Sequence, residues 1–299
     1  MATVRESVAT ACCTTNAQIV RESLAIASCA SLSSILGALL VILIPRSSLK
    51  PWLYGLLKSI LAGAVAVVII CDMGITETSL SSWASGLGSG ATLLFVGPLT
   101  LNPPSGPNKM HPRDENLTKD ELHELQKREF DSPDVRKRAI YGGIVVAVAV
   151  GLRNLACGVW FFSFLKWRRA ELEYPSILIW CATESADLGA AVALPIYFGT
   201  KSRWRTMVAV VVSAAAFPLG QYLAAFTLPS LSFRSRMLEF QAGSMWTMVV
   251  YWMQSCSLET TPWRHCMVAF YAGFVCMLGI GFQQYQWGLI GLQHLKQVF

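Results

Sequence analysis

Three ionisable residues lie in the interior of long apolar stretches of the sequence, where a charge needs a partner. Arg153 lies near the middle of the stretch 139–165, and both Glu184 and Asp187 lie near the middle of the stretch 174–199. The two carboxylates are three residues apart, so in a helix they share one face. Because an ionisable group in hydrocarbon is costly unless it is paired or hydrated, such residues are candidates for function. We therefore expect Arg153 to form an ion pair with Glu184 or with Asp187.

Polar side chains with metal-binding atoms flank these charges. Asn154 and Cys157 follow Arg153, and Ser185 follows Glu184. Carboxylate and amide oxygens bind divalent cations, and a cysteine thiolate is a soft metal ligand. An inert buried thiol is the competing interpretation of Cys157, because such cysteines often pack as small hydrophobic groups. The expected substrate pathway consists of Arg153, Asn154, Cys157, Glu184, Ser185 and Asp187, and the expected metal ligands are Asn154, Cys157, Glu184 and Asp187.

The composition indicates that these residues are held in a membrane. The chain has 299 residues, of which 54% are hydrophobic and 14% are charged, whereas soluble domains are about a quarter charged. A helix of about 20 apolar residues crosses the hydrocarbon layer. We predict an all-α, polytopic membrane bundle of about eight transmembrane helices over residues 24–299, after a short N-terminal extension, 1–23. The predicted spans are 24–44, 52–75, 83–101, 139–165, 174–199, 206–230, 237–256 and 266–292.

The first predicted span, and the acidic residues near the ends of other spans, each have a competing interpretation. The stretch 24–44 could be a signal peptide, but its apolar run exceeds the usual core of about 7 to 15 residues and further spans follow. A membrane-spanning helix is therefore favoured. Asp72, Glu77 and Glu239 lie near the ends of predicted spans, where we expect them to be hydrated.

The sequence lacks the motifs that are typical of enzymes, and its net positive charge does not indicate a nucleic-acid-binding protein. It has no paired histidine motif, no Ser-His-Asp constellation and no phosphate-binding loop. We therefore expect a protein that is not an enzyme, with no catalytic residues and no prosthetic group. The net charge of +6 arises mainly from Lys and Arg residues between the spans, which topology explains better than a polyanionic partner.

The distribution of basic residues predicts the orientation of the chain. Eight spans put both termini on one side, and fifteen of the 24 Lys and Arg residues fall on the opposite side. Because cytosolic loops carry an excess of Lys and Arg, we expect non-cytosolic termini and a cytosolic loop at 102–138. The expected location is the plasma membrane or an organelle membrane.

Residues 184–203 contain a motif that resembles a known family. They begin Glu-Ser-Ala-Asp-Leu-Gly, continue through an apolar run to Pro-Ile-Tyr, and end in a short basic loop. The fifth helix of the ZIP zinc and iron permeases has His-Asn-x-Pro-Glu-Gly, an apolar run, Pro-Ile-Tyr and a basic loop. Residues 153–158 are similar to the other copy of that motif, and residues 213–220 to the family's Ser-Gly-Leu-Ala-Glu-Pro-Leu-Gly. From about residue 24 onward, the chain resembles a divergent ZIP protein.

The chain departs from the family at the expected metal ligands. The family has His, Asn and Glu in the fourth helix, the same three in the fifth, and an acidic residue in the sixth. The corresponding positions here are Arg153, Asn154, Cys157, Glu184, Ser185, Leu188 and Phe217. An arginine at a ligand position would repel a divalent cation in a medium of low dielectric.

The resemblance implies a transporter of divalent metal ions, with zinc as the first candidate and iron as the second, through a site between the fourth and fifth helices. The alternative is a transport-inactive pseudo-transporter, in which Arg153 paired with Glu184 or Asp187 replaces the metal. The expected partners are the lipid bilayer and a divalent metal ion as substrate, with no nucleic acid. A homodimer is possible.

Overall fold

The computed structural model describes residues 2–45, 51–74, 80–100, 132–167, 174–227, 230–259 and 263–298. Within these ranges all regular secondary structure is α-helical, which confirms the predicted all-α class. The helices are α1 (Ala2–Leu43), α2 (Pro51–Gly74), α3 (Leu80–Thr100), α5 (Pro133–Trp167), α6 (Tyr174–Thr200), α7 (Arg203–Thr227), α8 (Leu231–Glu259) and α9 (Trp263–Val298).

Five stretches within the described ranges are long and apolar enough to cross a membrane. They are Val20–Leu43, Trp52–Cys71, Pro133–Ser163, Arg203–Thr227 and Trp263–Gln283. The helices α3, α6 and α8 pack among the helices that contain these stretches. The molecule is therefore a helical membrane bundle, and the crossing of the bilayer by all eight helices stays a prediction.

The helix ends differ from the predicted span ends mainly by extension. The helix α1 includes residues 2–23, the predicted N-terminal extension, and α5 begins inside the predicted loop 102–138. Ser132 starts α5 early because its hydroxyl accepts a hydrogen bond from the Val135 N–H at 3.4 Å, with Pro133 at the first helical position. Residues 102–131 of the predicted loop lie outside the described residues.

Four pairs of helices cross closely because each helix presents a glycine to the backbone of the other. A Cβ at Gly37 of α1 would meet the backbone of Ala186, and a Cβ at Gly189 of α6 would meet the backbone of Ser34. The same reciprocal arrangement recurs for α5 with α7, α2 with α9 and α3 with α8, through Gly158 and Gly220, Gly63 and Gly273, and Gly86 and Gly243. Small residues allow this approach, which supplies packing between helices that share an apolar solvent.

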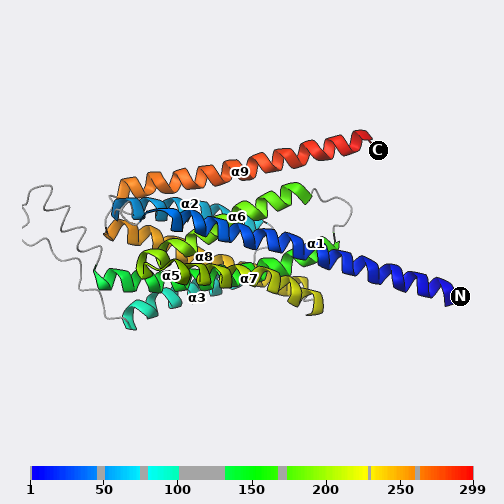
Figure 1. Cartoon of the computed structure of the whole chain (residues 1–299), viewed down its shortest axis with the longest axis horizontal. Helices are drawn as coiled ribbons and strands as arrows, with labels where there is room; N and C mark the ends of the chain where they lie inside the picture. Colours follow the sequence, from blue (N-terminus) through cyan, green and yellow to red (C-terminus); the bar gives the residue numbers. More distant parts are fainter. Residues whose placement is uncertain are drawn as a thin grey trace, which may run out of the picture.

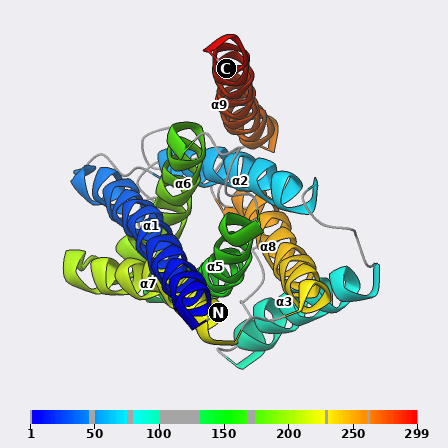
Figure 2. The ribbon, with the colours of Figure 1, turned by 90° about the vertical axis from the view of Figure 1, so that its right-hand side faces the viewer.

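The pairs assemble around α5. The helices run along the long axis of the molecule, and both ends of the chain lie at the same end of the bundle (Figure 1). Seen from that end, α5 lies near the centre, whereas α9 lies at the periphery against α2 (Figure 2). The residues carried by the middle of α5 are therefore held inside the bundle.

The α1–α7 contact satisfies a carbonyl that a proline exposes. Pro218 lies inside α7 and has no N–H, so the carbonyl of Ala214, four residues earlier, lacks its usual helical donor. The Ser31 hydroxyl of α1 donates a hydrogen bond to that oxygen at 3.1 Å. A side-chain donor from a neighbouring helix is one of the ways in which membrane proteins tolerate an interior proline.

Removing this donor should destabilise the chain only while the proline is present. We expect Ser31→Ala to lower the free energy of unfolding by about 1 to 2 kcal/mol, because the Ala214 carbonyl then has no donor. In a Pro218→Ala background the restored N–H bonds to that oxygen, so adding Ser31→Ala should cost less than about 0.5 kcal/mol. Unfolding in mixed micelles, followed by circular dichroism, measures both. The control Ser33→Ala removes an exposed hydroxyl bonded within α1, and an equal loss there would contradict the explanation.

Candidate functional site

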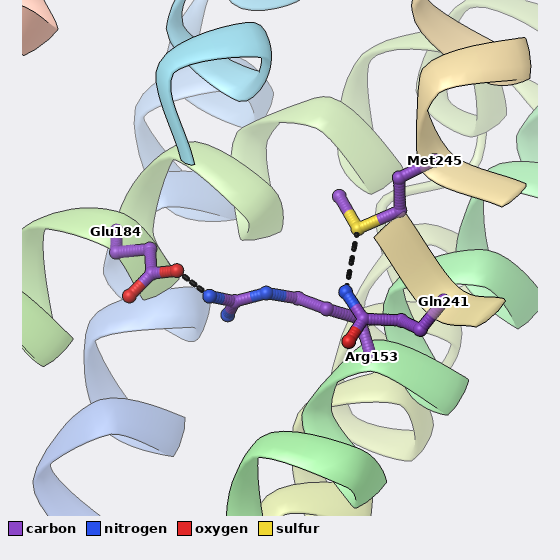
Figure 3. A network of polar contacts seen from close by, with 4 residues as sticks. All are labelled: Arg153, Glu184, Gln241 and Met245. Atoms are coloured by element: carbon purple, nitrogen blue, oxygen red, sulfur yellow. Dashed lines mark hydrogen bonds and ion pairs between the residues drawn. The ribbon is translucent and has the colours of Figure 1, made fainter. Parts of the chain in front are cut away.

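Arg153 and Glu184 form an ion pair in the interior of the bundle. Nη2 of Arg153 contacts Oε1 of Glu184, and the two side chains are 3% and 8% exposed. Arg153 extends from α5 toward α6, where it meets the carboxylate (Figure 3). Of the two partners expected for Arg153, Glu184 is therefore the one in contact. The pairing offsets the cost of holding either charge away from water.

The helix α8 adds two side chains to this centre. Gln241 Nε2 donates to the sulfur of Met245 at 3.4 Å, and both residues are buried where α8 meets α5 (Figure 3). Gln241 Oε1 has no hydrogen-bond partner within the described part of the chain. A buried acceptor without a donor costs free energy, so this oxygen is available to a cation or to a moving donor.

Asn154 is held by α7 rather than by the charged pair. Its Nδ2 donates a hydrogen bond to the Ser213 carbonyl at 3.0 Å, and the residue is buried. Because the amide nitrogen is used in this way, Oδ1 is the atom that could serve a metal ion. Asn154 therefore joins α5 to α7 in addition to any role as a ligand.

The remaining residues of the predicted pathway lie on the same two helices. Ser185 is buried beside Glu184 on α6, and Asp187 is partly buried one turn further along. Asp187 forms no ion pair or hydrogen bond with another described residue. Cys157 is partly buried on α5, one turn from Arg153, and packs against an apolar cluster. The predicted ligands thus occupy neighbouring turns of α5 and α6.

The described side chains contain no ready-made metal cage. Among the described residues, no three His, Cys, Asp or Glu side chains lie close enough together to hold one ion. The assignment of Asn154, Cys157, Glu184 and Asp187 as metal ligands therefore stays a prediction.

The sequence-based predictions were wrong for one interior charge, Glu239, and did not include another, Lys58. Glu239, expected to be hydrated at a helix end, is 2% exposed, because α8 begins at Leu231 rather than at 237 and carries the residue two turns into the bundle. Lys58 is buried on α2 with its Nζ 5.8 Å from the centre of the Tyr54 ring, a cation–π contact. The side chain of Asp72, and Glu77 altogether, lie outside the described residues.

The chain is similar to a plant protein over most of its length. It is 25% identical over 254 residues to a protein of Arabidopsis thaliana named zinc transporter ZTP29. The aligned region covers 82% of this chain and 88% of the plant protein. No protein-family model matches the chain.

Proposed function

We propose that this chain is a ZIP-like membrane transporter of divalent metal ions, with zinc as the substrate ahead of iron. The observation that carries the proposal is the similarity, over most of both chains, to a plant protein named zinc transporter. The buried charges at the meeting point of α5 and α6 support it, because interior ionisable groups in membrane bundles mark substrate pathways.

The chemistry of the pathway suits a divalent cation that displaces an internal one. Glu184 and Asp187 supply carboxylates from one face of α6, Asn154 supplies Oδ1, and Cys157 supplies a sulfur from α5. Without metal, Arg153 neutralises Glu184. A metal ion that reaches the carboxylate competes with the guanidinium, so its binding breaks the α5–α6 ion pair and frees these helices to rearrange. Electrostatic exchange of this kind would couple occupancy to conformation.

A second function is favoured by the same contact. Arg153 carries a permanent charge at a position where the family resemblance places a metal ligand, and it already occupies Glu184. In a transport-inactive pseudo-transporter this pair takes the place of the metal and holds the bundle together. Stoichiometric zinc that binds the purified, unmutated chain and is lost in Asp187→Asn would contradict the inactive role.

Zinc uptake distinguishes the two functions. In cells that lack their own zinc uptake, we expect the chain to raise the initial rate of zinc entry above that of empty cells. Asp187→Asn should lower that rate about tenfold, because it removes a carboxylate from the pathway. Since Asp187 has no ion pair with a described residue, its loss should leave the fold intact.

The matched control changes an equivalent carboxylate outside the pathway. Asp134→Asn removes an exposed carboxylate from the first turn of α5 and should leave uptake unchanged. Equal amounts of each variant at the cell surface are required. Uptake at the level of empty cells from a well-expressed, unmutated chain would overturn transport in favour of the inactive role.

A further inference from the structure

Two cysteines lie on the same side of the central ion pair. Cys157 is one turn beyond Arg153 on α5, and Cys181 is one turn before Glu184 on α6. The two helices run in opposite directions, because Arg153 meets Glu184 whereas the earlier Gly143 approaches the later Ile196. Both cysteines are therefore displaced toward the end of the bundle where α5 ends and α6 begins.

The two thiols share their surroundings. Both pack against one apolar cluster, to which α1, α5 and α7 contribute buried side chains that include Ile26, Phe161 and Phe217. Both are partly exposed rather than sealed in the core, and they are not joined in a disulfide. The two thiols therefore share one environment on the same side of the ion pair.

A buried amide on α7 faces the same cluster. Gln221 lies between Phe217 and Ala224 on one face of α7, and both of these neighbours belong to the cluster. It is 1% exposed, and neither its Oε1 nor its Nε2 has a hydrogen-bond partner within the described residues. The Gln221 backbone also lies against Gly158, the residue after Cys157. An amide so deeply buried needs a partner, and its oxygen, on the face of α7 that meets the cluster contacted by both thiols, is a candidate for a further ligand atom.

We propose that Cys157, which the proposed pathway also uses, forms a second metal site with Cys181 and Gln221 Oε1, which takes a thiophilic divalent cation such as Zn²⁺ or Cd²⁺ in place of a pathway ion at Cys157. On binding, each thiol gives its proton to water and each sulfur forms a bond to the metal. The amide oxygen occupies a further position, and water completes the shell. This site concerns binding alone, so it stands whether or not the ion crosses the membrane.

Charge balance selects a divalent over a monovalent cation. Two thiolates carry two negative charges, so a divalent ion leaves the site neutral within the apolar cluster. A monovalent ion such as Cu⁺ would leave one uncompensated negative charge, which burial penalises. Arg153 does not supply the missing charge, because Glu184 already neutralises it.

Cadmium titration tests the site in the purified full-length chain. Cys12 and Cys13 are first replaced by serine, so that these adjacent thiols do not bind the metal. With a non-thiol reductant present, we expect the ultraviolet charge-transfer band of cadmium thiolate to saturate at about one ion per chain, with about two protons released. Cys181→Ser should abolish the two-thiolate band and weaken binding at least about tenfold, and Cys157→Ser should do the same.

Two further variants separate a ligand from a structural residue. Cys276→Ser removes an exposed thiol of α9 and should leave the band and the affinity unchanged. Gln221→Leu should weaken Cd²⁺ binding several-fold while the band persists, whereas a purely structural amide would alter unfolding and leave affinity unchanged. A Cys181→Ser chain with the full band and affinity overturns the site.

An alkylation experiment covers the case in which a variant does not fold. It uses the chain in which Cys12 and Cys13 are replaced by serine and every other cysteine is intact. Bound Zn²⁺ should slow maleimide labelling of Cys157 and Cys181, while Cys276 is labelled at its usual rate. Equal labelling of Cys157 and Cys181 with and without the metal would also overturn the proposal. Cadmium binding without zinc uptake would refute the proposed transport and leave this site standing.

Discussion

Arg153→Ala is expected to lower the free energy of unfolding by about 3 to 5 kcal/mol, because it leaves the Glu184 carboxylate buried without its counter-charge. Thermal and detergent-induced unfolding in mixed micelles, followed by circular dichroism, measures the loss. The control Arg203→Ala removes an exposed guanidinium at the start of α7 and should change stability by less than about 0.5 kcal/mol.

A double replacement shows whether the loss comes from the unpaired charge. Removing both partners, with Arg153→Met and Glu184→Leu together, should recover most of the stability, because a buried ion pair and an apolar pair of similar volume often have comparable stability. If Arg153→Ala were no more damaging than Arg203→Ala, the central pair would not support the bundle. Failure of the double replacement to recover stability would instead assign the loss to packing.

Gly189→Val is expected to destabilise the chain by about 3 kcal/mol or more, at the upper end of overpacking costs. A side chain at this position meets the backbone of Ser34 on α1, and backbone cannot move aside as a flexible side chain can. The two helices must then separate, which also displaces Ser185 and Glu184 on α6. Unfolding in mixed micelles measures the stability, and loss of zinc binding or uptake should accompany it.

The matched control places valine where there is room for it. Gly279 on α9 is exposed, and a Cβ there meets nothing within 4 Å. Gly279→Val should therefore be close to neutral, since valine and glycine differ little in helix propensity. Similar losses at Gly189 and Gly279 would show that helix propensity, rather than the α1–α6 crossing, sets the effect.

The positions of the helices could be predicted because a membrane helix is recognised in a sequence by the length and hydropathy of its apolar run. The stretch predicted at 174–199 is α6 at Tyr174–Thr200, and the stretch at 52–75 is α2 at Pro51–Gly74. The errors lie at helix ends, where polar turns continue the helix beyond the apolar run. One of these errors changed the predicted environment of a charged residue. The helix α8 starts at Leu231, earlier than predicted, and this places Glu239 inside the bundle.

The interior position of the central ion pair also followed from the sequence. Arg153 and Glu184 each lie near the middle of an apolar run. The partner of Arg153 could therefore be predicted to be one of two carboxylates on one helix face. Whether Asn154, Cys157, Glu184 and Asp187 bind a metal stays a prediction that sequence and structure share. Zinc as the substrate is likewise a proposal, supported by similarity to the plant protein.

The sequence by itself determined the helical membrane class, the order of the helices and the interior position of Arg153 and Glu184 along their helices. The tertiary structure decided that Arg153 meets Glu184 rather than Asp187, that Asn154 bonds to α7, and that Cys157 and Cys181 pack against one apolar cluster. The reason is that a helix in lipid is apolar on its outer face and often on its inner face too. The sequence of such a helix then specifies how far along the helix axis each residue lies. Which face of the helix turns toward each neighbour is set by how glycines and side chains pack.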